Sequence, residues 1–207
     1  MTNRKTAILG IGATGVSVAS FFAANEIPFD IVDSRKNPPN LELIKANYPV
    51  AEIALGSFDA DFLCRYDRLI VSPGISLAEP ALVKAKKKGV ELLGDLELFL
   101  EQAKAPVVVI SGSNGKSTVT ELLGKMAIES GLDVGIGGNL GTPMLELLDN
   151  AHKLYVIEVS SFQLELLDDS RGAISCLLNI SPDHLDRYKI YSNTTQLSIV
   201  FSVAPAR

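Results

Sequence analysis

The chain has 207 residues, which allows one large domain or two modest ones. Hydrophobic residues make up 47% of the chain, a share that supports a packed core and excludes an intrinsically disordered protein. The net charge of −5 argues against nucleic acid as the main partner. Cys64 and Cys176 stand far apart without metal-binding spacing, so we expect small buried side chains in a reducing cytoplasm.

The first predicted elements are a strand over Thr6–Leu9, a glycine turn, and a helix to about Ala24. This apolar stretch superficially resembles a targeting sequence or a short membrane span. Gly10, Gly12 and Gly15 interrupt it, so we expect neither. The elements expected next are strands over 29–33 and 68–71, a turn at 72–74, and helices over 41–47, 80–88 and 94–102.

A second strand–glycine–helix unit begins at Pro106, where residues 106–110 form a β-branched run typical of a buried parallel strand. We expect a glycine loop at 112–118, a helix over 119–130, a turn at 137–139, and strands over 154–159 and 174–180. Alternating strands and helices predict an α/β protein with parallel sheets. Since the glycine-loop opening occurs twice, we expect two doubly wound domains, over residues 1–93 and 94–207.

The glycine loop of the second unit predicts a phosphate site. Backbone N–H groups at a helix N-terminus bind anions, and glycine lets the backbone approach them closely. Lys116 supplies a positive charge for the β- and γ-phosphates, and Ser117 or Thr118 offers a hydroxyl to Mg²⁺. The loop is shorter than the usual Walker spacing, because Ile110 stands where that motif has its first glycine. The predicted ATP-binding residues are Gly112, Ser113, Asn114, Gly115, Lys116, Ser117 and Thr118.

The N-terminal glycine turn leaves several interpretations open. Gly10–Gly15 matches the dinucleotide fingerprint, and Asp33 lies at a suitable distance along the chain for a ribose contact. The turn would then hold NAD(P). It would equally hold another nucleotide diphosphate, with Arg35 near a phosphate or base edge, or it would only pack a helix on a strand.

Two polar segments follow strands of the second unit. Glu158 stands at the end of a predicted strand, where the acid of a phosphate-loop protein commonly serves the metal. Asp183 and His184 follow another strand end, so we expect both segments to converge at the carboxyl edge of the sheet. A metal or nucleotide contact is therefore the hypothesis for His184.

Taken together, four motifs resemble the Mur ligases of bacterial peptidoglycan synthesis, and most of all the members that add D-glutamate. They are Gly112–Thr118, Gly137–Asn139, Glu158–Gln163 and Asp183–Arg187, in the family's order. The resemblance covers roughly residues 5–188 and implies a Rossmann-like N-terminal domain and a P-loop ATPase-like central domain. It also implies a cytoplasmic enzyme that uses ATP and Mg²⁺ to join D-glutamate to UDP-N-acetylmuramoyl-L-alanine through an acyl phosphate.

The resemblance also implies roles for individual residues. Lys116 and His184 match catalytic positions, and Ser117, Glu158 and His184 match positions that hold metal. The positions near the sugar-nucleotide substrate are matched by Asn139, Ser160 and Gln163. The family's uridine-nucleotide surface is matched by Ala13, Thr14, Ser34, Arg35 and Gly74. The partners implied are small molecules, with no nucleic acid and no membrane, and we expect a monomer.

The match degrades after Arg187. The family carries a carbamylated lysine downstream of the histidine, whereas Tyr191–Leu197 occupies that region here and no lysine follows Lys189. We hypothesise a truncated or frame-shifted chain that lacks the rest of the central domain and the D-glutamate-binding C-terminal domain. The alternative to an active ligase is then a catalytically inactive remnant that binds UDP-sugar and ATP. An NAD(P) oxidoreductase would explain the first glycine turn but not the second.

Overall fold

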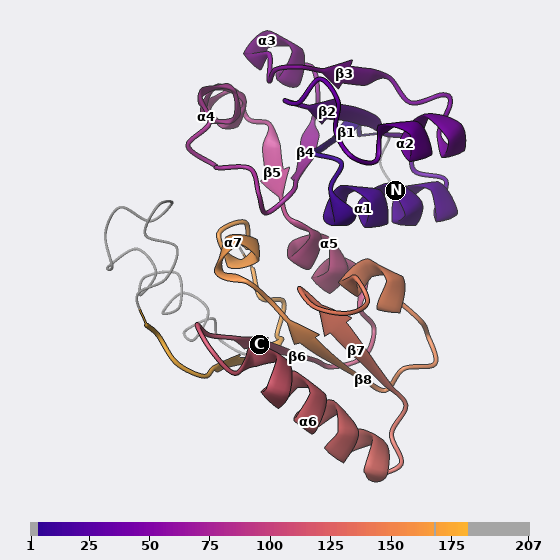
Figure 1. Ribbon diagram of the computed structural model, residues 1–207, viewed down its shortest axis with the longest axis vertical. Helices are drawn as coiled ribbons and strands as arrows, with labels where there is room; N and C mark the ends of the chain where they lie inside the picture. Colours follow the sequence, from indigo (N-terminus) through magenta and orange to yellow (C-terminus); the bar gives the residue numbers. More distant parts are fainter. Residues whose placement is uncertain (1–3, 168, 182–207) are drawn as a thin grey trace. The chain divides into compact units, whose positions relative to one another are not determined.

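The computed structural model describes residues 4–167 and 169–181 (Figure 1). The chain divides into two compact units, one ending at Asp95 and the other beginning at Leu96. No helix within the described residues is long and apolar enough to span a membrane.

The first unit is built on five parallel strands in the order β3-β2-β1-β4-β5. These strands are β1 (Thr6–Leu9), β2 (Asp30–Asp33), β3 (Ile53–Leu55), β4 (Arg68–Val71) and β5 (Glu91–Leu93). The connecting helices are α1 (Ala13–Ala24), α2 (Leu41–Asn47), α3 (Ala60–Leu63) and α4 (Pro80–Lys87). The strand order reverses between β1 and β4, as in a Rossmann-like doubly wound sheet, and this confirms the predicted fold class.

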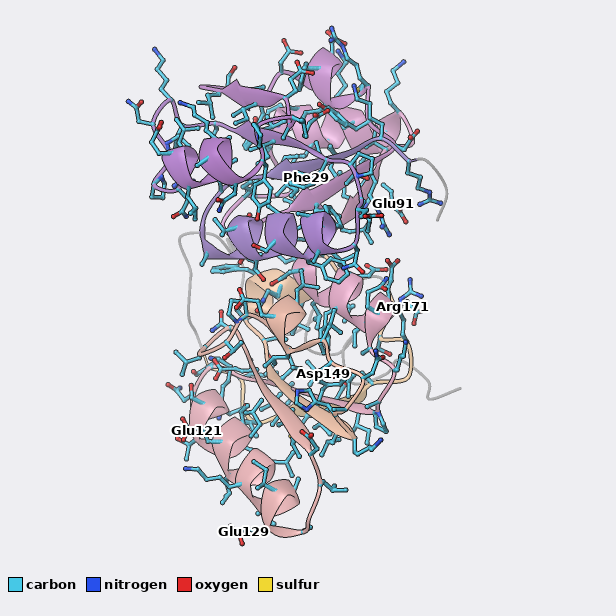
Figure 2. All side chains as sticks on the ribbon, turned by 90° about the vertical axis from the view of Figure 1, so that its right-hand side faces the viewer. Phe29, Glu91, Glu121, Glu129, Asp149 and Arg171 are labelled. Atoms are coloured by element: carbon cyan, nitrogen blue, oxygen red, sulfur yellow. The ribbon has the colours of Figure 1, made fainter. Side chains whose placement is uncertain are left out.

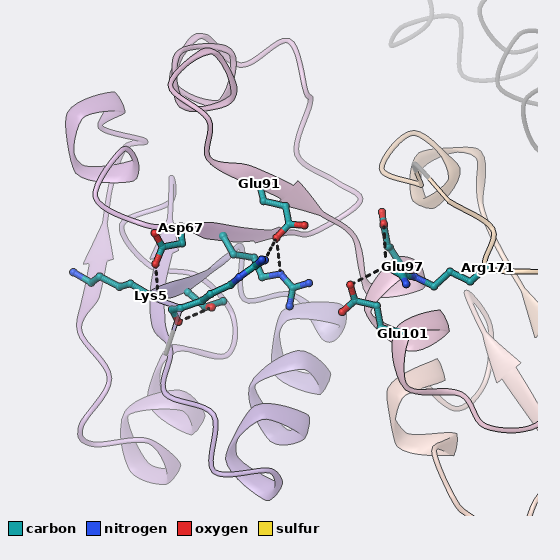
Figure 3. Close-up of polar contacts among 9 residues, drawn as sticks. Lys5, Asp67, Glu91, Glu97, Glu101 and Arg171 are labelled. Carbon is teal, nitrogen blue, oxygen red and sulfur yellow. Dashed lines mark hydrogen bonds and ion pairs between the residues drawn. The ribbon is translucent and has the colours of Figure 1, made fainter. Parts of the chain in front are cut away.

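The core of the first unit lies on both faces of its central strands. Ala7, Ile8 and Leu9 of β1 are completely buried, as a strand covered by helices on both faces requires. Ion pairs link the outer parts of the unit: Glu91 accepts from Arg4 at 2.7 Å and from Arg68 at 3.2 Å (Figure 3).

The second unit has a four-stranded parallel sheet in the order β7-β8-β6-β9. Its strands are β6 (Val107–Ser111), β7 (Val134–Gly138), β8 (Leu154–Glu158) and β9 (Ile174–Leu177). Its helices are α5 (Asp95–Gln102, which begins at the division between the units), α6 (Lys116–Glu129), the 3-10 helix η1 (Met144–Leu147) and α7 (Ser161–Leu164). Helix α6 packs on β6, β7 and β8, and Glu121 and Glu129 project from it into solvent (Figure 2).

Helix α5 is fixed to the second unit by apolar and ionic contacts. The ring of Phe99 meets that of Tyr155 edge-on, with centroids 5.2 Å apart. Arg171, in the loop before β9, pairs with Glu101 at 3.1 Å and with Glu97 at 3.9 Å (Figure 3).

Several element boundaries differ from the predictions. The predicted turn at residues 137–139 is wrong, because β7 continues through Gly138. Helix α6 begins at Lys116 instead of residue 119, directly after the left-handed Gly115. Strand β9 ends at Leu177, where residue 180 was expected. The sequence did not reveal the short elements β3, β5, α3, η1 and α7.

Candidate functional site

The phosphate loop connects β6 to α6 at the carboxyl end of the sheet. Gly112 and Gly115 have φ angles of 147° and 83°, in the region that favours glycine. No side chain caps α6 at Gly115, and no acidic residue stands in its first turn. The loop therefore presents backbone N–H groups and the positive end of a helix dipole, which together suit an anion.

Backbone oxygens of this loop hold the side chain of Lys116. Its Nζ donates to the carbonyl oxygen of Gly112 at 2.8 Å and to that of Ser113 at 3.3 Å. The ammonium group is half-buried, while Asn114 and Gly115 beside it are exposed. The loop is thus accessible from solvent and carries a cation held by backbone oxygens.

Glu158 ends β8 one strand away from the loop. Glu158 is 3% exposed. In the parallel pairing of β8 with β6 it lies opposite Ile110, close to where the loop begins. Asn139 Nδ2 donates to Glu158 Oε1 at 3.2 Å, and the Asn139 N–H donates to the Glu158 carbonyl at 2.8 Å. A Cβ on Gly138 would lie 2.2 Å from that same carbonyl oxygen, so only glycine permits this approach.

The structure therefore brings two predicted residues, Asn139 and Glu158, into direct contact. The predicted metal site also includes Ser117 and His184. Ser117 lies in the first turn of α6, while His184 falls outside the described residues. Among the residues that are described, no three His, Cys, Asp or Glu side chains gather in a way that would hold a metal ion.

Ser160 and Gln163, predicted near the substrate, form the cap of α7. Ser160 Oγ accepts from the Gln163 N–H at 3.3 Å, and Gln163 Oε1 accepts from the Ser160 N–H at 2.9 Å. This reciprocal pair is a capping box, which satisfies two N–H groups at the start of a helix. It positions both residues immediately after Glu158 and Val159.

Asn179 also belongs to this edge of the sheet. It follows β9, the neighbour of β6, and its side chain bonds to the backbone of Asn114. An asparagine after a strand carries no motif of its own, so the sequence gives it no role. Its place beside the strand that enters the phosphate loop is the signal that would have found it.

In the first unit, the glycine turn brings the start of α1 close to the end of β1. Gly10 has a φ of 85°, and a Cβ on Gly15 would lie 1.9 Å from the Gly10 carbonyl oxygen. Helix α1 has no side-chain cap at Gly12 and no acid in its first turn. Its first residues, the exposed Ala13 and the half-buried Thr14, therefore lie at an uncapped helix N-terminus.

Asp33, at the end of β2, is committed to partners within the chain. Its carboxylate accepts from the Ile11 N–H at 3.0 Å, from the Arg35 N–H at 2.9 Å, and from the Arg35 guanidinium at 2.9 and 2.7 Å. Burial alone would raise the pKa of Asp33, but the bonds from Arg35 and Ile11 outweigh it and lower that pKa below its ordinary value. The Asp33 carboxylate is thus already engaged where the dinucleotide fingerprint would use it for ribose.

The predicted uridine-nucleotide residues all follow the carboxyl ends of neighbouring strands. Ala13 and Thr14 come after β1, Ser34 and Arg35 after β2, and Gly74 after β4. Ser72 Oγ donates to the Gly10 carbonyl at 3.0 Å and thereby ties the loop after β4 to the glycine turn. The loops after β1 and β4 flank the switch in strand order, where open α/β sheets bind ligands, and the loop after β2 lies on the next strand.

Comparisons with known proteins find two family domains along the chain. Residues 4–94 match the family model of the Mur ligase MurD-like N-terminal domain, and residues 110–197 match that of the Mur ligase middle domain. The chain is 50% identical over 188 residues to the UDP-N-acetylmuramoylalanine--D-glutamate ligase of Pseudomonas savastanoi pv. phaseolicola. It is 52% identical over 181 residues to the ligase of the same name from Pseudomonas putida.

These alignments cover 91% and 87% of this chain but 42% and 40% of the two relatives, so the chain spans about two fifths of their length. Among solved structures, UDP-N-acetylmuramate:L-alanyl-gamma-D-glutamyl-meso-diaminopimelate ligase from Neisseria meningitides is similar with a TM-score of 0.56 and 17% identity. That match covers 99% of this chain and 69% of the other, and it concerns the fold alone. With two successive Mur ligase domain models matched along its length, the chain belongs to the Mur ligase family.

Proposed function

We propose that this chain carries the uridine-nucleotide and ATP sites of a cytoplasmic ligase that joins D-glutamate to UDP-N-acetylmuramoyl-L-alanine in peptidoglycan synthesis. The observation that carries the proposal is the phosphate loop, uncapped at Gly115 and holding the Lys116 ammonium, beside the buried carboxylate of Glu158. The names of relatives about half identical to this chain supply the substrate.

In this proposal, the residues of the second unit handle ATP and magnesium. Gly112–Thr118 would hold the phosphates, because the loop offers N–H groups, a cation and no acid in the first helical turn. Ser117 and Glu158, with His184, would hold Mg²⁺, which would neutralise charge on the transferring phosphoryl group. The oxygen of a buried carboxylate that is already oriented by Asn139 suits such an ion.

The residues of the first unit would hold the uridine nucleotide. The uncapped start of α1 at Ala13 and Thr14 suits a diphosphate. Ser34, Arg35 and Gly74 line the same sheet edge. Because the Asp33 carboxylate already serves Ile11 and Arg35, this edge favours a uridine nucleotide over NAD(P).

The proposed reaction has two steps. The alanyl carboxylate attacks the γ-phosphorus of ATP, so that an acyl phosphate forms and ADP leaves. The amine of D-glutamate then attacks the acyl carbon, the amide bond forms, and inorganic phosphate leaves. Lys116 would stabilise the charge on the transferring phosphoryl group, and Asn139, Ser160 and Gln163 would lie near the sugar-nucleotide substrate.

A substitution of the loop lysine tests the ATP site. We expect Lys116→Met to weaken ATP binding about 10- to 100-fold, the effect of losing a charge-assisted bond. Lys125→Met is the matched control, because Lys125 lies on the same helix, is exposed, and pairs with the exposed Glu121 at 3.6 Å. Isothermal titration of the purified chain with ATP and Mg²⁺ measures both. Equal affinities for the two variants would contradict the assignment.

A second candidate function is binding of the nucleotides without turnover. ADP release with UDP-N-acetylmuramoyl-L-alanine, measured with and without D-glutamate, separates the two. Release that depends on D-glutamate supports the ligase. Nucleotide binding without ADP release supports the second candidate.

A further inference from the structure

The segment after β9 lies against the phosphate loop. Strands β6 and β9 are parallel neighbours, with Ser111 opposite Leu177, so the residues that follow them leave the sheet side by side. The Leu178 N–H continues this pairing by donating to the Ser111 carbonyl at 3.0 Å. The loop is therefore contacted along one side by residues 178–181.

Asn179 bonds to two consecutive residues of the loop. Its Oδ1 accepts from the Asn114 N–H at 2.9 Å, and its Nδ2 donates to the Asn114 carbonyl at 2.8 Å. Its own carbonyl accepts from the Ser113 N–H at 3.2 Å. A carboxamide is suited to this task, because it offers one acceptor and a donor to the two polar groups of a single residue.

Two neighbouring features support the same contact. Gly112 brings the chains together: a Cβ there would lie 3.2 Å from the Asn179 nitrogen and from Leu178 Cβ. Ser113 Oγ accepts from the Ser181 N–H at 2.9 Å and donates to the Ser181 carbonyl at 3.1 Å. The first half of the loop is thus bonded to the segment after β9 by both backbone and side chains.

The second half of the loop is arranged differently. Helix α6 follows Gly115 directly, and the first N–H groups of a helix have no partner within it. The Val119 N–H donates to the Gly115 carbonyl at 3.1 Å and marks where the helical bonding begins. The N–H groups of residues 116–118 precede that point, so the anion-binding end of the loop is its helical half.

We propose that Asn179 is a positioning residue of the phosphate loop. It holds the Ser113–Asn114 backbone, so that phosphate is taken by the N–H groups from Gly115 onward and by Lys116. It keeps its bonds to Asn114 when nucleotide binds. The identity of the anion as the phosphates of ATP rests on the proposed function.

Amide hydrogen exchange in the full 207-residue chain, resolved by NMR with and without ATP and Mg²⁺, tests this proposal. We expect Asn179→Ala to speed exchange of the Asn114 N–H and to weaken ATP binding by about 5- to 10-fold, the effect of losing neutral hydrogen bonds. Asn25→Ala is the control, since its amide likewise bonds one backbone oxygen, that of Phe21 at 2.8 Å, in the first unit. It should change neither quantity.

Asn179→Asp separates positioning from general stability. The carboxylate still accepts from the Asn114 N–H but cannot donate to its carbonyl, and it adds a negative charge beside the anion. We expect this variant to protect the Asn114 N–H better than Asn179→Ala while binding ATP more weakly. Because the added charge alone opposes ATP, exchange of the Asn114 N–H is the deciding readout, and exchange as fast in Asn179→Asp as in Asn179→Ala would overturn the proposal.

Two further outcomes, both measured on the unsubstituted chain, test the proposal and the proposed function separately. If ATP binding to the unsubstituted chain removes the protection of the Asn114 N–H, then Asn179 is displaced by nucleotide and the proposal is wrong. If the unsubstituted chain binds no ATP, the proposed function fails. The contact between Asn179 and Asn114 then stands or falls on the exchange rate in Asn179→Ala alone.

Discussion

The carboxylate of Asp33 organises the glycine turn of the first unit. It is 2% exposed and accepts hydrogen bonds from Ile11 and from the backbone and guanidinium of Arg35. We expect Asp33→Asn to lower the free energy of unfolding by about 2 kcal/mol, because an amide cannot accept all of these bonds and leaves donors unsatisfied. Denaturant unfolding of the purified chain measures the change, and Asp61→Asn is the control. Asp61 also pairs with a cation, Lys84, but is exposed, so its loss should have little effect.

The pH dependence of this contribution has a definite sign. The folded pKa of Asp33 lies below its unfolded value of about 4. Its contribution to stability is therefore complete above that unfolded value and is lost as the pH falls through the folded pKa. The stability difference between the unsubstituted chain and Asp33→Asn should accordingly shrink on acidification below about pH 4. A constant difference from pH 7 to pH 3 would contradict the assigned partners.

At the scale of elements, the close approach of α1 to β1 depends on one glycine. A Cβ on Gly15 would lie 1.9 Å from a backbone oxygen, and backbone cannot move aside as a side-chain tip can. Gly12 in the same turn has nothing within 4 Å of its Cβ position and a φ of −75°, which alanine adopts easily. We expect Gly15→Ala to destabilise the first unit by about 2 kcal/mol or more, and Gly12→Ala by less than about 1 kcal/mol. Thermal unfolding compares them, and equal effects would contradict this packing.

The same close approaches explain which elements the sequence predicts and which it hides. The β-branched run of β6 and the glycine–lysine loop after it are read directly, because burial and anion binding select those residue types. Strand β7 is hidden, because its glycines resemble a turn. Glycine is required at these positions, because a Cβ on Gly135 would lie 2.7 Å from the Tyr155 ring and one on Gly137 would lie 2.3 Å from the Thr142 carbonyl oxygen. Such contacts exist only between segments that the fold brings together.

The candidate site likewise has residues that the sequence identifies and contacts that it does not. Lys116, Glu158 and Asp33 stand at strand ends or in a glycine loop, so local pattern is enough to identify them. The pairing of Asn139 with Glu158, and of Asn179 with Asn114, depends on the order β7-β8-β6-β9. Strand order is a property of the whole sheet, and no single segment carries it.

At the scale of the whole molecule, each unit encloses a core of its own. Phe22 of α1 is 1% exposed in the first unit, and Phe99 of α5 is completely buried in the second. Removing either phenylalanine ring should lower the free energy of unfolding by about 3–5 kcal/mol. We expect Phe22→Ala to lower only the transition of the first unit, and Phe99→Ala only that of the second. Residue-resolved hydrogen exchange assigns each transition, with Val32 and Val156 reporting on the two central cores. If either substitution lowers protection equally at Val32 and Val156, the chain unfolds as one cooperative body and the division at Asp95 has no energetic meaning.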